Sequence, residues 1–393
     1  MTISDCSERE LIARIHARLP PAPAWLLVGI GDDAAVVEPE RNRVEVLTVD
    51  ALVEGVHFDR RFVPPDAIGH RALAVNLSDL AAMGAAPRLA LLSLALPAAL
   101  PLADFDSLIA GVASLADRYR VHVAGGNLTR SPGPLMLDIT CTGTVKPRQV
   151  LKRSGARPGD TLYVSGTIGA AAAGLMMLRD SITTHPQLST TEDTEDTEEQ
   201  SRSGNVSTSV SPVSSVVESS LVESSAVERC IQRYLRPEPR IRLGLMLARN
   251  RAASACMDLS DGLSDAVYQL TAASGVGARI DADALPIEPG AREVFGARGA
   301  DPVADAITGG DDYELLVSVR PRTRSRLAAA MRHGGVPLTR IGVCTEDRAV
   351  VLCRDGADEP LPQGGYSHFR STALQQAQGT PSSSRGEASS RST

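Results

Sequence analysis

The stretch GIGDDAAVV, residues 29–37, sets Asp32 and Asp33 side by side between glycines and an apolar run. Two adjacent carboxylates repel each other, and few cations lie near them in the sequence. A Gly-Asp pair most often forms a turn, because glycine tolerates positive φ and aspartate hydrogen-bonds its own backbone. The second aspartate needs a further reason, and we expect a divalent metal ion to neutralise at least one of the two carboxylates.

Similar acid motifs recur along the chain, each beside a predicted strand or at the edge of a predicted helix. Asn76 and Asp79 lie three residues apart on one helical face among apolar neighbours, where an unpaired charge is unfavourable. Asp50 and Asp258 each end a hydrophobic strand and need a counter-charge. Carboxylate oxygens suit a hard cation, and magnesium is the usual one where phosphates share the coordination sphere. The motifs are TVD (48–50), NLSD (76–79), DLSDG (258–262) and GGDDYE (309–314).

The first 150 residues carry alternating helix and strand patterns that predict one α+β unit. Ser7 and Glu10 have the spacing of a capping box, which indicates a short N-terminal helix. Asp66 is the expected N-cap of a longer helix. We expect strands at 44–49, 89–96 and 134–145, and helices at 65–85 and 104–119.

A second unit begins with a predicted strand at 161–166, and its helix and strand patterns indicate an α/β domain over residues 151–370. Serine, threonine and acids dominate residues 181–213, and this composition predicts a disordered insertion. We expect a helix to follow it up to about residue 235. Residues 371–393 are of low complexity and are predicted to form a disordered tail.

Composition bounds the class of protein. The 393 residues are 43% hydrophobic, which is ample for a core in each of two domains. The net charge of −7 belongs to one segment, since residues 181–228 hold nine acids and one base. No arginine-rich stripe interleaved with aromatics is present, which argues against nucleic-acid binding. No apolar run approaches a membrane span and the first residues are acidic, so we expect a cytoplasmic protein with no membrane partner.

Two glycine-rich motifs and one basic motif could contact phosphates. GGNLTR (125–130) follows a predicted strand, and its glycines would let backbone N–H groups approach a phosphate beside Arg130. GTIGAAAAG (166–174) joins a strand to a helix, where either an anion at the helix N-terminus or tight packing of small residues would explain it. LKRSGARPGD (151–160) adds Lys152 and Arg153. No Walker A sequence occurs.

Hydrolysis by a Ser/His/Asp triad is a poor fit to the sequence, because no G-x-S-x-G elbow is present. His57 is the one histidine close to an acid motif, and a structural role is favoured over a catalytic one on sequence alone. The six cysteines are scattered, which indicates free thiols rather than a zinc site or a disulfide framework.

Seven motifs in a fixed order resemble the thiamine-monophosphate kinase family, in the superfamily that includes aminoimidazole ribonucleotide synthetase. The resemblance covers about residues 5–370, interrupted by the serine-rich insertion. It implies transfer of the γ-phosphoryl group of ATP onto thiamine monophosphate, with several magnesium ions. Because the nucleophile is already an ionised phosphate oxygen, we expect direct, in-line transfer without a catalytic side chain. The resemblance also implies a homodimer whose N-terminal mixed sheets pair into a barrel-like interface. The motifs are GIGDDAAVV, TVDALVEGVHF, HRALAVNLSDLAAMGA, LKRSGARPGD, RYLRPEPR, MDLSDGLSD and GGDDYELL.

The same resemblance implies three sets of site residues. Two departures from the family pattern matter: Asn127 stands where an aspartate usually binds metal, and Asp311 stands where related sequences often have glutamate. The implied metal ligands are Asp33, Thr48, Asp50, Asp79, Asn127, Asp258 and Asp261. The implied ATP contacts are Gly126, Asn127, Arg153 and Ser260, and the implied substrate contacts are His57, Asp311 and Tyr366.

Two other functions are compatible with these residues. The chain could be another ATP-dependent enzyme of the superfamily, similar to aminoimidazole ribonucleotide synthetase. A non-catalytic regulator that binds metal or nucleotide would also retain the acid motifs. Incubation with ATP, magnesium and thiamine monophosphate separates these possibilities.

Overall fold

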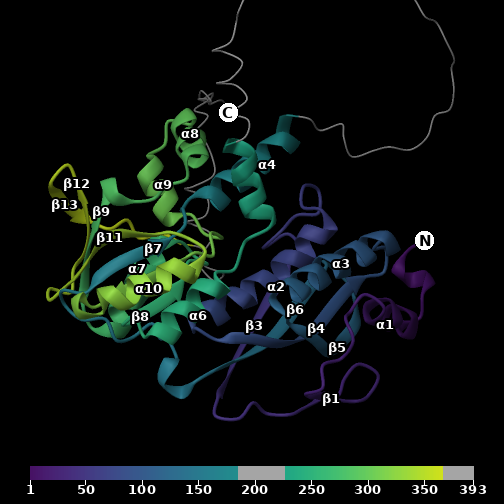
Figure 1. The fold of residues 1–393 in the computed structure, drawn as a ribbon. Helices are drawn as coiled ribbons and strands as arrows, with labels where there is room; N and C mark the ends of the chain where they lie inside the picture. Colours follow the sequence, from purple (N-terminus) through teal and green to yellow (C-terminus); the bar gives the residue numbers. More distant parts are fainter. Residues whose placement is uncertain (185–225, 366–393) are drawn as a thin grey trace, which may run out of the picture.

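Two large β-sheets organise the chain, one on each side of residue 150 (Figure 1). The computed structural model describes residues 1–184 and 226–365. The first sheet has the strand order β3-β6-β4-β5, and the second has the order β13-β12-β9-β11-β7-β10-β8. Strands β1 and β2 form a separate ribbon. The coarse prediction of a mixed α and β fold with two sheet-based units is therefore confirmed.

The elements before residue 150 are these, in chain order: η1 (Ile3–Asp5), α1 (Glu8–His16), β1 (Leu26–Val28), β2 (Val36–Val37), β3 (Val44–Val53), α2 (Pro65–Ala82), β4 (Ala86–Pro97), α3 (Leu102–Tyr119), β5 (His122–Ser131), β6 (Met136–Val145) and η2 (Pro147–Gln149). Those that follow are β7 (Thr161–Ser165), α4 (Ala170–Thr184), an unlabelled helix over 226–235, α6 (Ile241–Asn250), β8 (Ala255–Asp258), α7 (Leu263–Ser274), β9 (Gly277–Asp281), η3 (Ala282–Ala284), α8 (Pro289–Ala297), α9 (Pro302–Thr308), β10 (Leu315–Val319), η4 (Pro321–Thr323), α10 (Arg324–Gly334), β11 (Leu338–Thr345), β12 (Val350–Arg354) and β13 (Ala357–Pro360).

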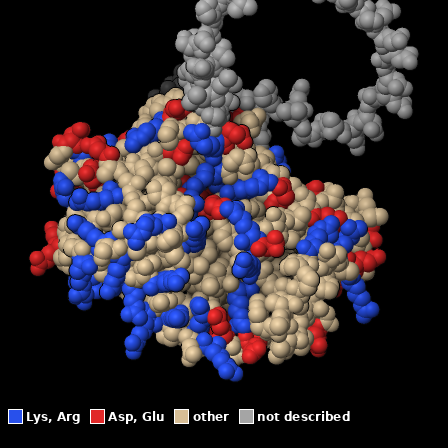
Figure 2. Space-filling model, in the orientation of Figure 1, with Lys and Arg blue, Asp and Glu red and all other residues tan. Residues whose placement is uncertain are grey.

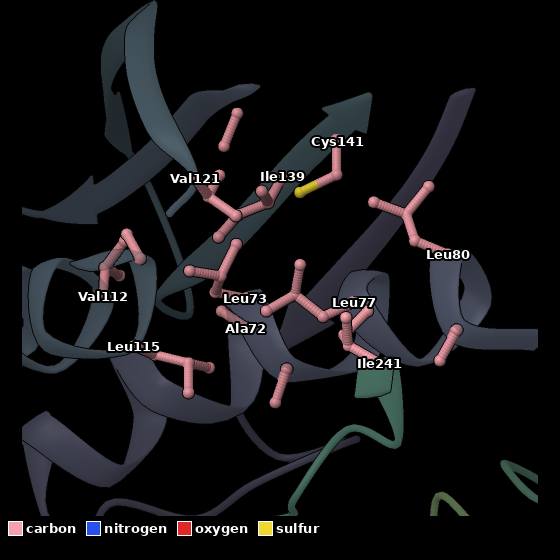
Figure 3. Packing of buried hydrophobic residues seen from close by; sticks show 14 of the residues in the cluster. Ala72, Leu73, Leu77, Leu80, Val112, Leu115, Val121, Ile139, Cys141 and Ile241 are labelled. Carbon is pink, nitrogen blue, oxygen red and sulfur yellow. The ribbon is translucent and has the colours of Figure 1, made fainter. Parts of the chain in front are cut away.

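Helices α2 and α3 cover one face of the four-stranded sheet. Figure 3 shows their apolar side chains packed against β6 and against the start of α6. Leu73 and Leu77 of α2 are fully buried there, beside Ile139 of β6. The other face of the sheet carries Leu47 and Val49 of β3, which are 70% and 59% exposed. The period-2 alternation of β3 thus separates a buried face from an apolar but exposed one.

The strands β8 and β10 of the seven-stranded sheet are buried along their whole length, whereas the edge strand β13 is exposed. Leu315 and Val317 of β10 belong to the core that α2, α6 and α10 share with the first sheet. Leu316 belongs to a second core with α7, α8 and α9. Strands covered on both sides read as continuous apolar runs, which is why LLVSV shows no alternation. The strand pairs of this sheet are antiparallel except for β9 and β12, so its topology is more mixed than the α/β expectation.

Helix α6 lies so close to α2 that only glycine fits at the crossing. A Cβ atom on Gly244 would lie 2.1 Å from the backbone oxygen of Ala81. Both helices pack into the core shared by the two sheets, so this crossing helps to fix the position of the second unit on the first.

The segment RYLRPEPR, residues 233–240, joins the two units through ionic contacts. Glu238 accepts hydrogen bonds from both terminal nitrogens of Arg118 on α3, at 2.6 and 2.8 Å. Arg236 pairs with Asp66 on α2. At the other end of the segment, Arg240 pairs with the fully buried Glu314.

The ends of the helices agree with some of the local predictions and not with others. Ser7 and Glu10 form the expected capping box. The prediction that Asp66 caps α2 is wrong: Pro64 is the N-cap residue, and Asp66 lies in the first turn, where it pairs with Arg236. The helix expected up to about residue 235 is present over 226–235. The predicted tail at 371–393, and the insertion at 181–213 beyond the end of α4, lie outside the described residues.

No helix in residues 1–184 or 226–365 is both long enough and apolar enough to span a bilayer. All six cysteines are free thiols, as expected.

Candidate functional site

Three aspartates from distant parts of the sequence lie together where β3, α2 and β8 meet. Asp50 is on the helix-covered face of β3, Asp79 is on α2, and Asp258 ends β8. Asp50 and Asp79 share a hydrogen bond, and Thr48 of β3 donates its hydroxyl to Asp79 Oδ2. Ser78 Oγ donates to Asp258 Oδ2 at 2.7 Å. The structure thus brings together four of the seven predicted metal ligands, and Ser78 joins them.

The three carboxylates repel one another, and they are largely shielded from solvent. Burial, together with the charges of Asp79 and Asp258, raises the pKa of Asp50 to about 7. Burial and the charge of Asp79 likewise raise the pKa of Asp258 to about 7. The pKa of Asp79 is also raised by burial, although the hydrogen bond from Thr48 opposes the shift. Arg153 favours the ionised forms of Asp79 and Asp258 but does not cancel this effect.

A pocket of about 380 Å³ opens beside the cluster. Thr48, Asp79 and Asp258 line one part of it, and Lys152 and Arg153 line another. Arg153 is held by a 2.7 Å hydrogen bond from Nη1 to Gln269 Oε1 on α7. A pocket with both carboxylates and cations can take a phosphate together with the divalent ions that accompany it.

Basic side chains also cover a neighbouring face of the molecule. Figure 2 shows Lys and Arg side chains gathered over α6 and α10. The sequence from 241 to 257 and the sequence from 320 to 345 contain nine arginines and no acid. Such a surface raises the local concentration of anionic substrates and speeds their encounter with the protein.

The donor set fits magnesium in kind. Carboxylates and a hydroxyl are hard oxygen ligands, and the raised pKa values of Asp50 and Asp258 indicate a need for positive charge. Among residues 1–184 and 226–365, however, no three His, Cys, Asp or Glu side chains are already arranged around one point as metal ligands. Asp50 and Asp79 are hydrogen-bonded to each other instead, as expected when a proton offsets their repulsion.

Asp33 lies in the connection between β1 and β2, outside the strands and the helix that carry this cluster. Its side chain is exposed, and its backbone N–H donates to Asp32 Oδ1 at 2.9 Å. The β1–β2 ribbon on either side of Asp33 packs on the first sheet, where Leu26 and Ala124 share a small core. In the part of the chain that the structure describes, no hydrogen bond joins Asp33 to Asp50.

The motif GGNLTR lies within β5, whereas the sequence predicts that it follows the strand. Gly126 and Asn127 pair with Leu92 and Ser93 of β4 in parallel register. Gly126 has φ +158°, and a Cβ atom there would lie 1.9 Å from the backbone oxygen of Leu92. Close strand packing therefore accounts for this glycine. Asn127 is exposed at the edge of the sheet.

The start of α4 in GTIGAAAAG binds an internal carboxylate. The buried Asp312 accepts hydrogen bonds from the backbone nitrogens of Gly169 and Ala171, at 2.7 and 3.2 Å. The backbone N–H groups of Gly169 and Ala171 already have an acceptor. The alternative that they bind a phosphate is therefore wrong. Gly174 lies against the backbone of Cys230, which favours the alternative of tight packing.

The loops DLSDG and GGDDYE lie side by side. The backbone N–H of Asp311 donates to Ser260 O at 2.7 Å, and that of Tyr313 donates to Leu259 O at 3.0 Å. A Cβ atom on Gly365 would lie 3.7 Å from the Cβ atom of Asp261, so the described end of the chain also reaches this loop. Tyr366 lies outside the described residues.

Two residues that the sequence did not single out connect His57 to Asp311. Tyr234 donates its hydroxyl to the backbone oxygen of His57 at 3.4 Å. The guanidinium of Arg71 lies 4.4 Å above the ring of Tyr234, and it also pairs with Asp311 at 3.3 Å. Arg71 lies in the motif HRALAVNLSDLAAMGA, and Tyr234 lies in RYLRPEPR. Their roles depend on contacts between residues more than 160 positions apart in the sequence, which no local spacing indicates.

Comparison with protein families places both units of this chain among the AIR synthase-related proteins. Models of their N-terminal and C-terminal domains match residues 31–145 and 201–353. The chain belongs, more narrowly, to the thiamine-monophosphate kinase family. It is 37% identical to the thiamine-monophosphate kinase of Salmonella typhimurium, over 93% of this chain and 98% of that protein.

Solved structures support the same assignment. The crystal structure of thiamine-monophosphate kinase from Stenotrophomonas maltophilia K279a matches with a TM-score of 0.71 at 36% identity, over 90% of this chain and 98% of the other. The structure described as "AaThiL complexed with AMPPCP and TMP" matches with a TM-score of 0.66 at 30% identity, over 94% and 99% of the two chains.

Proposed function

We propose that this protein catalyses the ATP-dependent phosphorylation of thiamine monophosphate to thiamine diphosphate, the last step in the biosynthesis of that cofactor. The observation that carries the proposal is the convergence of Asp50, Asp79 and Asp258 beside a pocket that Lys152 and Arg153 also line. The family assignment supports it, as does the related structure described with an ATP analogue and TMP.

Thr48, Asp50, Asp79 and Asp258 would hold magnesium, and the family motifs add Asp33, Asn127 and Asp261. Bound there, magnesium would offset the repulsion between the phosphates of donor and acceptor. Arg153 would bind a phosphate as a fixed cation, together with ATP contacts from Gly126, Asn127 and Ser260. His57, Asp311 and Tyr366 would contact the thiamine moiety.

The reaction needs little from the protein beyond positioning and charge. The acceptor is an ionised phosphate oxygen, so no general base is required. We therefore infer direct in-line transfer without a phosphorylated enzyme. The roles of these residues are to orient the two phosphates and to exclude water from the pocket.

A homodimer would bury the exposed apolar face of the first sheet. Val49 on β3 and Leu91 on β4 lie on either side of Thr140 of β6, and they are 59% and 37% exposed. Pairing of this face with that of a second copy would give the barrel-like interface. In this proposal residues 1–150 bind ATP and magnesium and dimerise, residues 151–370 complete the site, and the enzyme acts in the cytoplasm, where ATP is available.

The test is a direct assay. The purified protein, incubated with ATP, magnesium and thiamine monophosphate, should form thiamine diphosphate, and Asp79→Asn should lower kcat at least about 100-fold, as expected for loss of a charged group that acts in the transition state. With labelled ATP, a reaction quenched within the first turnover should leave no label on the protein. Aminoimidazole ribonucleotide synthetase-like activity, or nucleotide binding without turnover, would instead support one of the two alternatives.

A further inference from the structure

The buried guanidinium of Arg71 is unusual for the interior of a helix. Arg71 lies in the middle of α2 with a side chain that is 1% exposed. Its Nη1 donates to the backbone oxygen of Tyr234, and its Nη2 lies 3.3 Å from Asp311 Oδ1. Its Nε has no hydrogen-bond partner among residues 1–184 and 226–365. Because burial of a charge costs more than burial of an apolar side chain of the same size, packing alone does not explain an arginine here.

Asp311 has a strained backbone conformation, and one oxygen of its carboxylate makes the contacts to protein groups. Its φ of +70° is in the left-handed region, and Tyr313 two residues on has φ +50°. Two such residues in one loop cost about 1–2 kcal/mol each, and strain of this kind gathers at functional sites. The hydroxyl of Tyr313 donates to Asp311 Oδ1 at 3.0 Å, so this oxygen is shared by Tyr313 and Arg71.

The other oxygen of Asp311 is available to a ligand. The side chain of Asp311 is 32% exposed, and within the described ranges its Oδ2 accepts no hydrogen bond. Arg71 and Tyr313 therefore fix the orientation of the carboxylate through Oδ1. Oδ2 remains able to accept a hydrogen bond from a ligand, in a direction that this orientation sets.

The position of Asp311 relative to the cluster suits an acceptor that carries a phosphate at one end. Ser260 lies two residues after Asp258, the last residue of β8, and its backbone oxygen accepts the hydrogen bond from the backbone N–H of Asp311. A substrate whose phosphate lies near Asp258 can thus extend its organic part toward Asp311.

We propose that Arg71 is a positioning residue, which fixes Asp311 so that Oδ2 accepts a hydrogen bond from the exocyclic amino group of the aminopyrimidine ring. This inference rests on the proposed function only in taking thiamine monophosphate as the molecule that binds here. Arg71 offsets the charge of Asp311, so the pair suits a neutral N–H donor better than it suits a second cation. Arg71 itself does not touch the substrate.

The experiment measures the Kd of thiamine monophosphate by calorimetry, with magnesium, and compares it with the Kd of an analogue whose exocyclic amino group is replaced by hydrogen. The wild type should bind the analogue about 10- to 100-fold more weakly, the range for one hydrogen bond to a charged group. Asp311→Asn should weaken binding of the amino substrate and remove the preference. Arg71→Lys and the nearly isosteric Tyr313→Phe should reduce the preference, while the Kd for ATP stays unchanged.

Arg233→Lys is the matched control, because Arg233 also pairs with a buried carboxylate, Glu314, at 2.7 Å. It should change Tm without changing the preference for the amino group. A lower Tm in Arg71→Lys and Tyr313→Phe with an unchanged preference would show that Arg71 is structural only. A preference retained by Asp311→Asn would also overturn the proposal. If the wild type shows the preference but forms no thiamine diphosphate, the inference holds and the proposed function fails.

Discussion

At the scale of single residues, the site is a set of carboxylates that the fold brings into mutual repulsion. Asp50 and Asp258 come from strands more than 200 residues apart, and burial raises the pKa of each to about 7. Thr48 and Ser78 donate hydroxyl hydrogen bonds that partly offset the repulsion. A residue set of this kind weakens the fold in order to bind cations, a trade-off common at functional sites.

The repulsion between these buried carboxylates makes the stability of the metal-free protein depend on pH. A carboxyl whose pKa is higher in the folded state than in the unfolded state contributes stability that is fully present below about pH 4 and is lost as the pH rises through about 7. The Tm measured in a chelator should therefore fall between pH 5 and pH 8, and magnesium should restore part of it.

Asp50→Asn should raise the metal-free Tm at pH 8 and flatten its dependence on pH. Asp117→Asn is the control, because Asp117 is exposed on α3 and its replacement should shift Tm little at either pH. A metal-free Tm that rises from pH 5 to pH 8 in the wild type, and not in Asp50→Asn, would contradict this account.

At the scale of elements, backbone proximity decides where glycine is needed. Gly244 on α6 faces the backbone of Ala81 on α2, whereas a Cβ atom on Gly296 of α8 would meet no other part of the described chain within 4 Å. Both residues lie in helices, so the intrinsic helix propensity of alanine favours both substitutions by up to about 1 kcal/mol. Only the tertiary contact distinguishes them.

Gly244→Ala should lower the free energy of unfolding by about 1–3 kcal/mol, because the two helices must move apart. Gly296→Ala should leave the stability unchanged or raise it slightly. Chemical denaturation of both variants measures the difference. Equal effects would mean that the α2–α6 crossing does not constrain the fold.

The elements show how far sequence reasoning can reach. Period-2 alternation predicts β3, and helical spacing places Asp79 on a helix. The assignment of Thr48, Asp50, Asp79 and Asp258 to one site comes from the family resemblance. The carboxylate at the start of α4 could not be predicted, because Asp312 reaches Gly169 across 143 residues. The role of Arg71 cannot be predicted from local patterns for the same reason, since its partners Tyr234 and Asp311 are distant in the sequence. Local patterns report which face a residue occupies, but they do not report its partner.

At the scale of the whole molecule, the exposed apolar face of the first sheet indicates assembly. Three large apolar side chains on β3 and β4 remain exposed there, although the rest of the sheet alternates regularly. They are Leu47, Val49 and Leu91.

Leu91→Glu should convert a dimer into a monomer in analytical ultracentrifugation, because a charge would be buried in the interface. Met331→Glu is the matched control, since Met331 on α10 is also 37% exposed but lies outside this sheet. A wild type that sediments as a monomer at micromolar concentration would contradict the proposed dimer.

The most direct test of the central claim is the location of bound divalent ions. Crystals grown with an ATP analogue and Mn²⁺ should give anomalous difference peaks within about 2.2 Å of carboxylate oxygens of Asp50, Asp79 and Asp258, the distance expected for a hard cation of this size. Ordered nucleotide with manganese peaks elsewhere, and with these three aspartates still hydrogen-bonded to protein groups only, would contradict the account.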